Sequence, residues 1–149
     1  MVPSRMFKAF TAEGGIRLPL LVKLPGDMAN SGTMNNAFLH VRDMMPTILD
    51  LALIDAGNTS TPAPQVSQVG YELFGMKAFI SGPWKLLQLP EPFGTGDWQL
   101  YNLEKDPAEM TDLSAEFPDD RKKLIALWEQ YRQDNGVLDI SLDAANLLK

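Results

Sequence analysis

The stretch WQLYNLEKDPAEMTDL, residues 98–113, contains the strongest local signals in the chain. Its first six residues suit a strand in which Trp98, Leu100 and Leu103 face apolar neighbours. The run breaks at Asp106-Pro107, because proline cannot donate to a strand ladder and Asp-Pro favours a turn. Asp106, Glu109 and Asp112 could form a calcium loop, but their spacing misses the EF-hand pattern, so capping of a short turn explains them better. We therefore predict a strand followed by a tight, capped turn.

Three more strand candidates precede this one, and turn residues separate them. The turns contain Gly75, Gly82-Pro83 and the segment 92–96. Short apolar runs between such turns are typical of an antiparallel meander. The four predicted strands cover 70–74, 76–81, 84–89 and 98–103.

A helix is predicted over about residues 119–134, opened by Pro118 and closed by Gly136. Its apolar side chains recur at i, i+3, i+4 and i+7, which gives one apolar stripe. That stripe is expected to pack on one face of the meander. Asp119 and Asp120 resemble a metal pair, but their place before an amphipathic run is better explained by helix capping and first-turn charge. The stripe consists of Leu124, Leu127, Trp128 and Tyr131.

The first half of the chain has a different pattern. Residues 1–15 are expected to form a loop, and Ile16–Leu24 is dense enough in apolar residues for a strand buried on both faces. A buried helix is predicted from Asp43 to Ala52, with Asp43 as N-cap and Pro46 in the first turn. The segment 58–68 has few apolar side chains and two prolines, which is typical of a linker.

Four segments, in the same order, resemble the C-terminal part of the sulfatases within the alkaline-phosphatase-like superfamily. The first runs from Glu13 to Gly26 and the second from Asp43 to Ala52. The third is GPWKLL, residues 82–87, and the fourth has the pattern L-Y-N-L-x-x-D-P-x-E-x-x-D-L from residue 100. The segments FTAEGG (10–15) and GYELFGMKA (70–78) are similar to the bacterial arylsulfatases.

The resemblance implies an α/β fold divided into two parts. Residues 1–57 would be a buried strand and helix from the large mixed-sheet domain, and 58–68 would be the linker. Residues 69–149 would form the small C-terminal subdomain, an antiparallel sheet packed by a helix. Sulfatases carry a longer segment where this linker lies, so the linker is either a real deletion or incomplete sequence.

The resemblance also implies a chemistry. Sulfatases use a formylglycine made from Cys or Ser in a C/S-x-P-x-R motif, and a calcium ion held by Asp and Asn side chains. This chain contains neither motif. We therefore expect no cofactor to be bound by the chain itself, and expect calcium and formylglycine in a full-length parent.

Lys8 is the candidate catalytic residue. By composition alone it would be an ordinary exposed lysine, but sulfatases place shortly before the Glu-Gly-Gly segment a lysine that reaches the sulfate ester. Gly14 and Gly15 would let the loop pass near the anion. Arg17 is interpreted as half of a structural ion pair. His40, the single histidine, is interpreted as structural because no partner typical of a catalytic or metal site lies nearby in the sequence.

Composition excludes several classes of function. The net charge of −6 argues against a nucleic-acid-binding face. No apolar run reaches the roughly 20 residues of a membrane span. The chain has no cysteine, so the redox compartment cannot be inferred, and localisation is open between bacterial periplasm and cytoplasm.

Three functions fit the sequence. The leading interpretation is the C-terminal portion of an arylsulfatase, inactive by itself, acting on a small-molecule sulfate ester. The alternatives are a phosphonate or phosphodiester hydrolase of the same superfamily, and a non-catalytic binding or assembly module. An isolated Ile16–Leu24 strand would expose apolar faces, so the chain is also expected to form a homodimer through that edge, or to aggregate.

Overall fold

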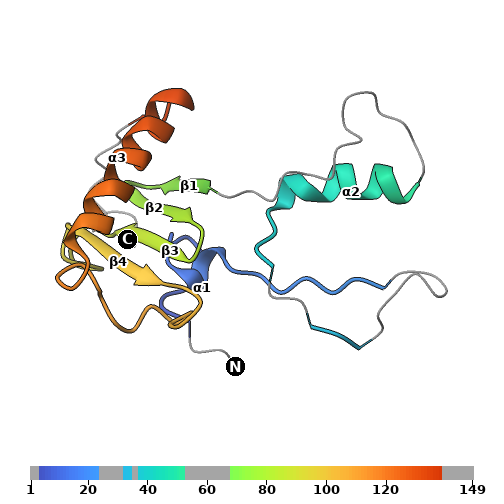
Figure 1. Ribbon diagram of the computed structural model, residues 1–149, viewed down its shortest axis with the longest axis horizontal. Helices are drawn as coiled ribbons and strands as arrows, with labels where there is room; N and C mark the ends of the chain where they lie inside the picture. The colour runs from blue at the N-terminus through green and yellow to red at the C-terminus, as the bar shows by residue number, and fades with distance from the viewer. Residues whose placement is uncertain (1–3, 24–31, 35–36, 53–67, 139–149) are drawn as a thin grey trace. The chain divides into compact units, whose positions relative to one another are not determined.

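The computed structural model describes residues 4–23, 32–34, 37–52 and 68–138. Contacts divide the chain into two units (Figure 1). Unit 1 comprises Met1–Arg17 together with Gln68–Lys149, and unit 2 comprises Leu18–Ser67. Each unit is described by itself.

The core of unit 1 is a four-stranded antiparallel sheet in the order β1-β2-β3-β4, which confirms the predicted meander (Figure 1). Phe74 and Gly75 join β1 to β2, and both have positive φ angles of 54° and 77°. Two consecutive residues with positive φ suit the twist of a two-residue hairpin. The strands are β1 (Gln68–Leu73), β2 (Met76–Ser81), β3 (Trp84–Gln88) and β4 (Trp98–Asn102).

Helix α3 (Pro118–Asp134) packs on one face of this sheet, as the apolar stripe predicts. Leu124 and Trp128 are its buried side chains. Asp119 and Asp120 lie in its first turn, where negative charge suits the helix dipole. Neither is the N-cap, which is Phe117, because the helix begins one residue earlier than expected. On the sheet side the cluster contains Phe79, Leu86 and Leu100.

The N-terminal segment covers the other face of the sheet. Phe10 and Ala12 are buried there among side chains that alternate with those facing α3. The segment ends in a short helix, α1 (Glu13–Ile16), where the sequence predicted a loop up to residue 15. Unit 1 therefore has three layers: α3, the sheet, and residues 4–17. The sheet residues in this second cluster are Met76, Ala78, Leu87, Leu89 and Tyr101.

Unit 2 contains the predicted helix, α2 (Met44–Leu51), after a short 3-10 turn (Val41–Asp43). Asp43 occupies the N-cap position and Pro46 lies in the first turn, as predicted, but the Asp43 side chain makes no capping hydrogen bond to α2. The predicted burial is wrong, since no residue of α2 is buried. His40 has a structural role. Its ring Nδ1 accepts the backbone N–H of Arg42 at 3.3 Å, and its backbone N–H donates to Asp43 Oδ2 at 2.7 Å.

The buried strand predicted over Ile16–Leu24 is not formed by the residues that the structure describes. Ile16 ends α1, and residues 17–23 have no regular secondary structure. Leu18 and Leu21 are 85% and 97% exposed. A strand needs a neighbour to pair its backbone groups, and the only sheet in the described part of the chain is β1–β4. The linker predicted over 58–68 lies outside the described residues, except for Gln68, which begins β1.

Candidate functional site

Lys8 lies on an exposed turn at the surface of unit 1. The Phe10 N–H donates to the Phe7 carbonyl at 3.2 Å and closes the turn. Met6 and Ala9, on either side of Lys8, have φ angles of 63° and 75°. Residues other than glycine rarely adopt this left-handed backbone conformation, which costs roughly 1–2 kcal/mol per residue. The Lys8 turn is therefore held in a conformation that its own residues do not favour.

Gly14 and Gly15 let this turn lie directly against α1. A Cβ on Gly15 would lie 2.0 Å from the Phe10 carbonyl oxygen, and one on Gly14 would lie 2.2 Å from the Met6 carbonyl oxygen. The Gly14 N–H also donates to the Arg5 carbonyl at 2.9 Å. These glycines were expected to let the loop pass near an anion; in the structure, the backbone that they approach is the loop that carries Lys8.

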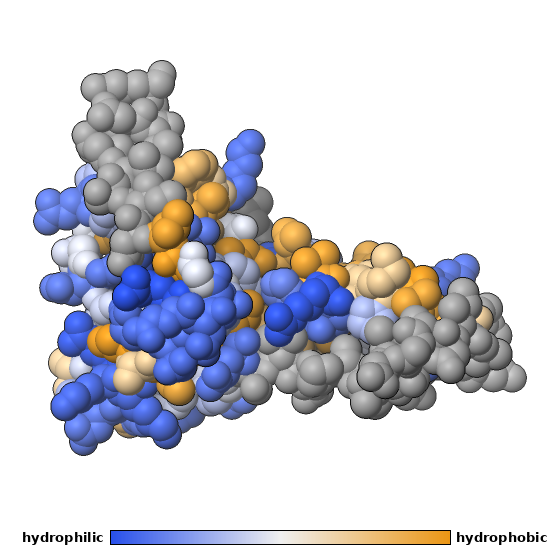
Figure 2. Space-filling model, turned by 90° about the horizontal axis from the view of Figure 1, so that it is seen from above, coloured by the Kyte–Doolittle hydropathy of each residue, from blue (hydrophilic) through white to orange (hydrophobic). Residues whose placement is uncertain are grey.

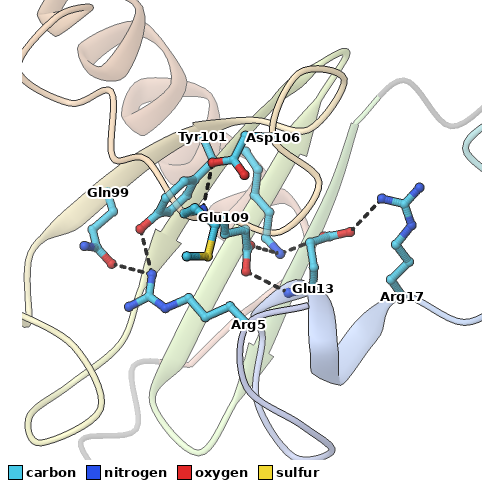
Figure 3. Close-up of polar contacts among 9 residues, drawn as sticks. Arg5, Glu13, Arg17, Gln99, Tyr101, Asp106 and Glu109 are labelled. Atoms are coloured by element: carbon cyan, nitrogen blue, oxygen red, sulfur yellow. Dashed lines mark hydrogen bonds and ion pairs between the residues drawn. The ribbon is translucent and has the colours of Figure 1, made fainter. Parts of the chain in front are cut away.

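A buried cluster of charges lies between this segment and the sheet (Figure 3). Lys85 of β3 is fully buried, and its Nζ lies 2.8 Å from Glu13 Oε1 and 2.7 Å from Glu109 Oε1. The other Glu109 oxygen accepts the backbone N–H of Glu13 at 2.9 Å. Arg17 lies 3.7 Å from Glu13, which confirms the ion pair expected for this arginine. Buried charges persist only when paired, so Glu13, Lys85 and Glu109 bind the segment to the sheet as a unit.

Sequence reasoning missed this cluster, because Lys85 was included only in an apolar strand and Glu109 only in a turn. One signal was available. Lys85, Leu87 and Leu89 share one face of the strand, and the two leucines are buried. A lysine in register with two buried leucines indicates a buried charge that needs a partner.

The acidic residues after β4 confirm the predicted capped turn at two of three positions. Asp106 Oδ2 accepts the N–H groups of Met110 and Thr111 at 2.7 and 2.8 Å. Asp112 Oδ1 accepts the N–H groups of Leu100 and Ser114 at 3.1 and 2.9 Å. Glu109 is the exception: it has a φ of 57°, and its side chain points into the ion cluster.

Side-chain contacts of Arg5 also fix the beginning of residues 4–17 to β4 (Figure 3). Arg5 Nη1 donates to the Tyr101 hydroxyl at 2.6 Å and to Gln99 Oε1 at 3.2 Å. Its guanidinium carbon also lies 5.9 Å from the centre of the Tyr101 ring. Burial raises the pKa of the Tyr101 phenol, and the positive charge of Arg5 only partly opposes that effect. Tyr101 therefore stays a neutral acceptor over the physiological range.

Asp112 has a pKa below its ordinary value. Desolvation raises it, but the hydrogen bonds from the Ser114 hydroxyl and from the Leu100 and Ser114 N–H groups together have the larger effect. A lowered pKa in the folded state means that the unfolded chain binds more protons as the pH falls. The stability that Asp112 contributes is present above the ordinary value of 3.8 and is lost as the pH falls through the folded pKa.

Replacing Asp112 with asparagine is expected to flatten the acid limb of the stability profile. Urea unfolding of the chain between pH 7 and pH 3 measures this, and Asp119→Asn is the matched control in an exposed first turn. The urea concentration at the unfolding midpoint could fall by the same amount between pH 5 and pH 3 in wild type and in Asp112→Asn. That result would contradict the role assigned to Asp112.

The described residues do not complete a catalytic centre around Lys8. No group of three or more His, Asp or Glu in them could hold a metal ion. Pockets of about 370 and 360 Å³ lie on the described surface of unit 1, and Lys8 lines neither. Among the residues that the structure describes, no helix is long and apolar enough to cross a bilayer.

Comparison with known proteins finds sulfatases among the similar sequences. No model of a protein family matches the chain. An uncharacterised sulfatase of Schizosaccharomyces pombe is 30% identical, over 91% of this chain and 28% of its own length. Arylsulfatase K of Danio rerio is 26% identical, over 77% of this chain and 25% of its own length. The chain thus spans about a quarter of the curated relatives that it matches.

A similar solved structure is that of a protein in complex with its substrate, D-glucosamine-2-N,6-O-disulfate. Its TM-score is 0.46 at 19% identity, over 68% of this chain and 25% of that one.

Proposed function

We propose that this chain, a homologue of the C-terminal part of the sulfatases, forms one portion of an enzyme that hydrolyses sulfate esters. The observation that carries the proposal is the 30% identity to a sulfatase over 91% of the chain. Similarity of that extent covers nearly all of the chain. The branch of the family, bacterial arylsulfatase, is part of the proposal.

Lys8 would be the catalytic residue that the chain supplies. When the S–O bond of a sulfate ester breaks, negative charge grows on the bridging and peripheral oxygens. A fixed ammonium group close to these oxygens stabilises that charge more than it stabilises the intact ester. Two features support this role: Lys8 is exposed, and the backbone on both sides of it is held in an uncommon conformation.

Other parts of the reaction would come from sequence outside this chain. A formylglycine supplies a nucleophile when present and calcium polarises the sulfate, but the chain has no cysteine and no C/S-x-P-x-R motif. The residues of the described ranges also do not fit a calcium site, because their acidic side chains form no suitable group. We therefore propose that the 149-residue chain alone does not turn over sulfate esters.

Exposed apolar side chains in unit 2 support membership of a larger protein. Apolar residues lie on the surface of this unit (Figure 2, in orange). A patch of this kind is typical of a surface that another part of a protein covers. The large exposed side chains include Leu18, Leu21, Val22, Leu39, Val41, Met45 and Ile48.

The test uses the longer reading frame obtained by extending the gene upstream of the Met1 codon. Replacing Lys8 with alanine in that protein is expected to lower kcat/KM for an aryl sulfate about 100- to 1000-fold, the cost of losing one fixed charge-stabilising donor. Hydrolysis of 4-nitrophenyl sulfate and 4-nitrophenyl phosphate is measured side by side. Lys23→Ala, an exposed lysine of unit 2, is the matched control.

Three outcomes would contradict the proposal. Faster turnover of the phosphate ester would favour the phosphoester hydrolase instead. An upstream sequence without a C/S-x-P-x-R motif, and no turnover of either ester, would favour the non-catalytic module. A Lys8→Ala protein within threefold of wild type would remove the catalytic role from that residue.

A further inference from the structure

We propose that Glu109 and Arg5 are positioning residues for Lys8, and that they hold its loop from both ends. The proposal rests on the function proposed above, because it assigns a purpose to the rigidity of that loop. It also gives a role to the glutamate of the D-P-x-E motif. That glutamate is the one acidic residue of the motif that does not cap the turn.

The Glu109 anchor lies at the C-terminal end of the loop. Its carboxylate is fully buried and contacts two groups, the backbone N–H of Glu13 at 2.9 Å and Lys85 Nζ at 2.7 Å. Asp106 holds the turn around it by accepting the N–H of Met110 at 2.7 Å. The carboxylate is thus aimed from a capped turn at the residue where the Lys8 loop enters α1.

The Arg5 anchor lies at the N-terminal end, only three residues before Lys8. Arg5 Nη1 binds the Tyr101 hydroxyl and Gln99 Oε1, both on β4. Tyr101 is 2% exposed and belongs to the apolar cluster that contains Phe10. Arg5 is therefore fixed to a rigid strand, because its acceptor cannot move without disturbing the core.

The two anchors explain the backbone strain beside Lys8. Non-glycine residues with positive φ persist only where the surroundings fix them, and Met6 and Ala9 both lie between the anchors. Releasing either anchor would let the turn relax, so that the backbone of Lys8, from which the ammonium group projects, would no longer be fixed. Electrostatic stabilisation depends on a charge that is already in place, so a mobile lysine would serve the reaction less well.

The experiment measures site-resolved proteolysis of the native 149-residue chain by an endoproteinase specific for lysine. In the Glu109→Gln and Arg5→Met chains, cleavage after Lys8 is expected to accelerate at least tenfold. Cleavage after Lys23, beyond the loop, is expected to stay unchanged, as is cleavage after Lys122 and Lys123 in α3. Arg132→Met is the matched control, because it removes a partly exposed ion pair with Glu129 at 2.8 Å on α3.

The outcomes separate local positioning from global stability. Unchanged cleavage after Lys8 in both variants would overturn the proposal. Equal acceleration after Lys8 and after Lys122 would also overturn it, because it would show a general loss of stability.

A second measurement separates this proposal from the proposed function. In the longer protein, Glu109→Gln is expected to lower kcat for 4-nitrophenyl sulfate more than it changes KM. The variants of the 149-residue chain could be cleaved faster after Lys8 while the longer protein shows no sulfatase activity. That result would support the two anchors and would remove only their catalytic purpose. An active parent whose kcat is unchanged by Glu109→Gln would overturn the positioning role itself.

Discussion

Replacing Lys85 with methionine is expected to lower the free energy of unfolding by about 3–5 kcal/mol, the usual cost of breaking a buried ion pair from one side. The methionine fills a similar volume, so the loss is electrostatic. Two carboxylates, Glu13 and Glu109, would remain in the interior without their shared cation. Urea unfolding followed by far-UV circular dichroism measures the change.

The control for Lys85 is a triple variant, Glu13→Gln, Lys85→Met and Glu109→Gln. It removes all three charges together, so most of the lost stability should return, as replacing a whole buried ion pair is often close to neutral. Arg132→Met, which breaks a partly exposed surface pair, should cost less than about 1 kcal/mol. A Lys85→Met chain as stable as wild type would show that the cluster is not buried as described.

Replacing Trp128 with alanine is expected to cost about 3–5 kcal/mol, the range for deleting a large buried aromatic side chain. Trp128 is 1% exposed and has ring contacts to Phe79, Trp98 and Tyr131, with centroids 6.2, 5.7 and 5.9 Å away. Its removal would leave a cavity between α3 and the sheet. The same urea experiment measures the loss.

Leu127→Ala is the matched control for Trp128. Leu127 neighbours it on α3 but is only partly buried, so a clearly smaller loss is expected. Trp128 lies on the face of the sheet opposite the Lys8 segment, so under native conditions its removal should not selectively accelerate cleavage after Lys8. A Trp128→Ala chain that loses no more stability than Leu127→Ala would contradict the packing of α3.

The sequence predicts the sheet and α3 well, because their signals are local. Short apolar runs between turn residues mark β2 and β3, whose middle residues are buried without a break, and Leu124 and Trp128 follow the period of a helix. Ile16–Leu24 shows the limit of this method. An apolar run indicates that a segment needs a covering partner, but not that the described chain supplies one.

The candidate site is only partly predictable. Lys8 is a candidate only through a family resemblance and the glycine pair through backbone chemistry, whereas no sequence pattern indicates the long-range contacts of Glu109 and Lys85. Glu109 binds the N–H of a residue 96 positions away, and Lys85 binds a carboxylate 72 positions away. No local pattern encodes pairings at such separations.

The amino-acid sequence by itself determined which segments of unit 1 become strands and which becomes the long helix, because neighbouring residues decide backbone hydrogen bonding and the apolar face. Only the tertiary structure decided that residues 4–17 cover the free face of the sheet, and that Lys85 lies between two glutamates. A charge can be buried only where folding brings its counter-charges within contact distance, and that depends on the whole of unit 1.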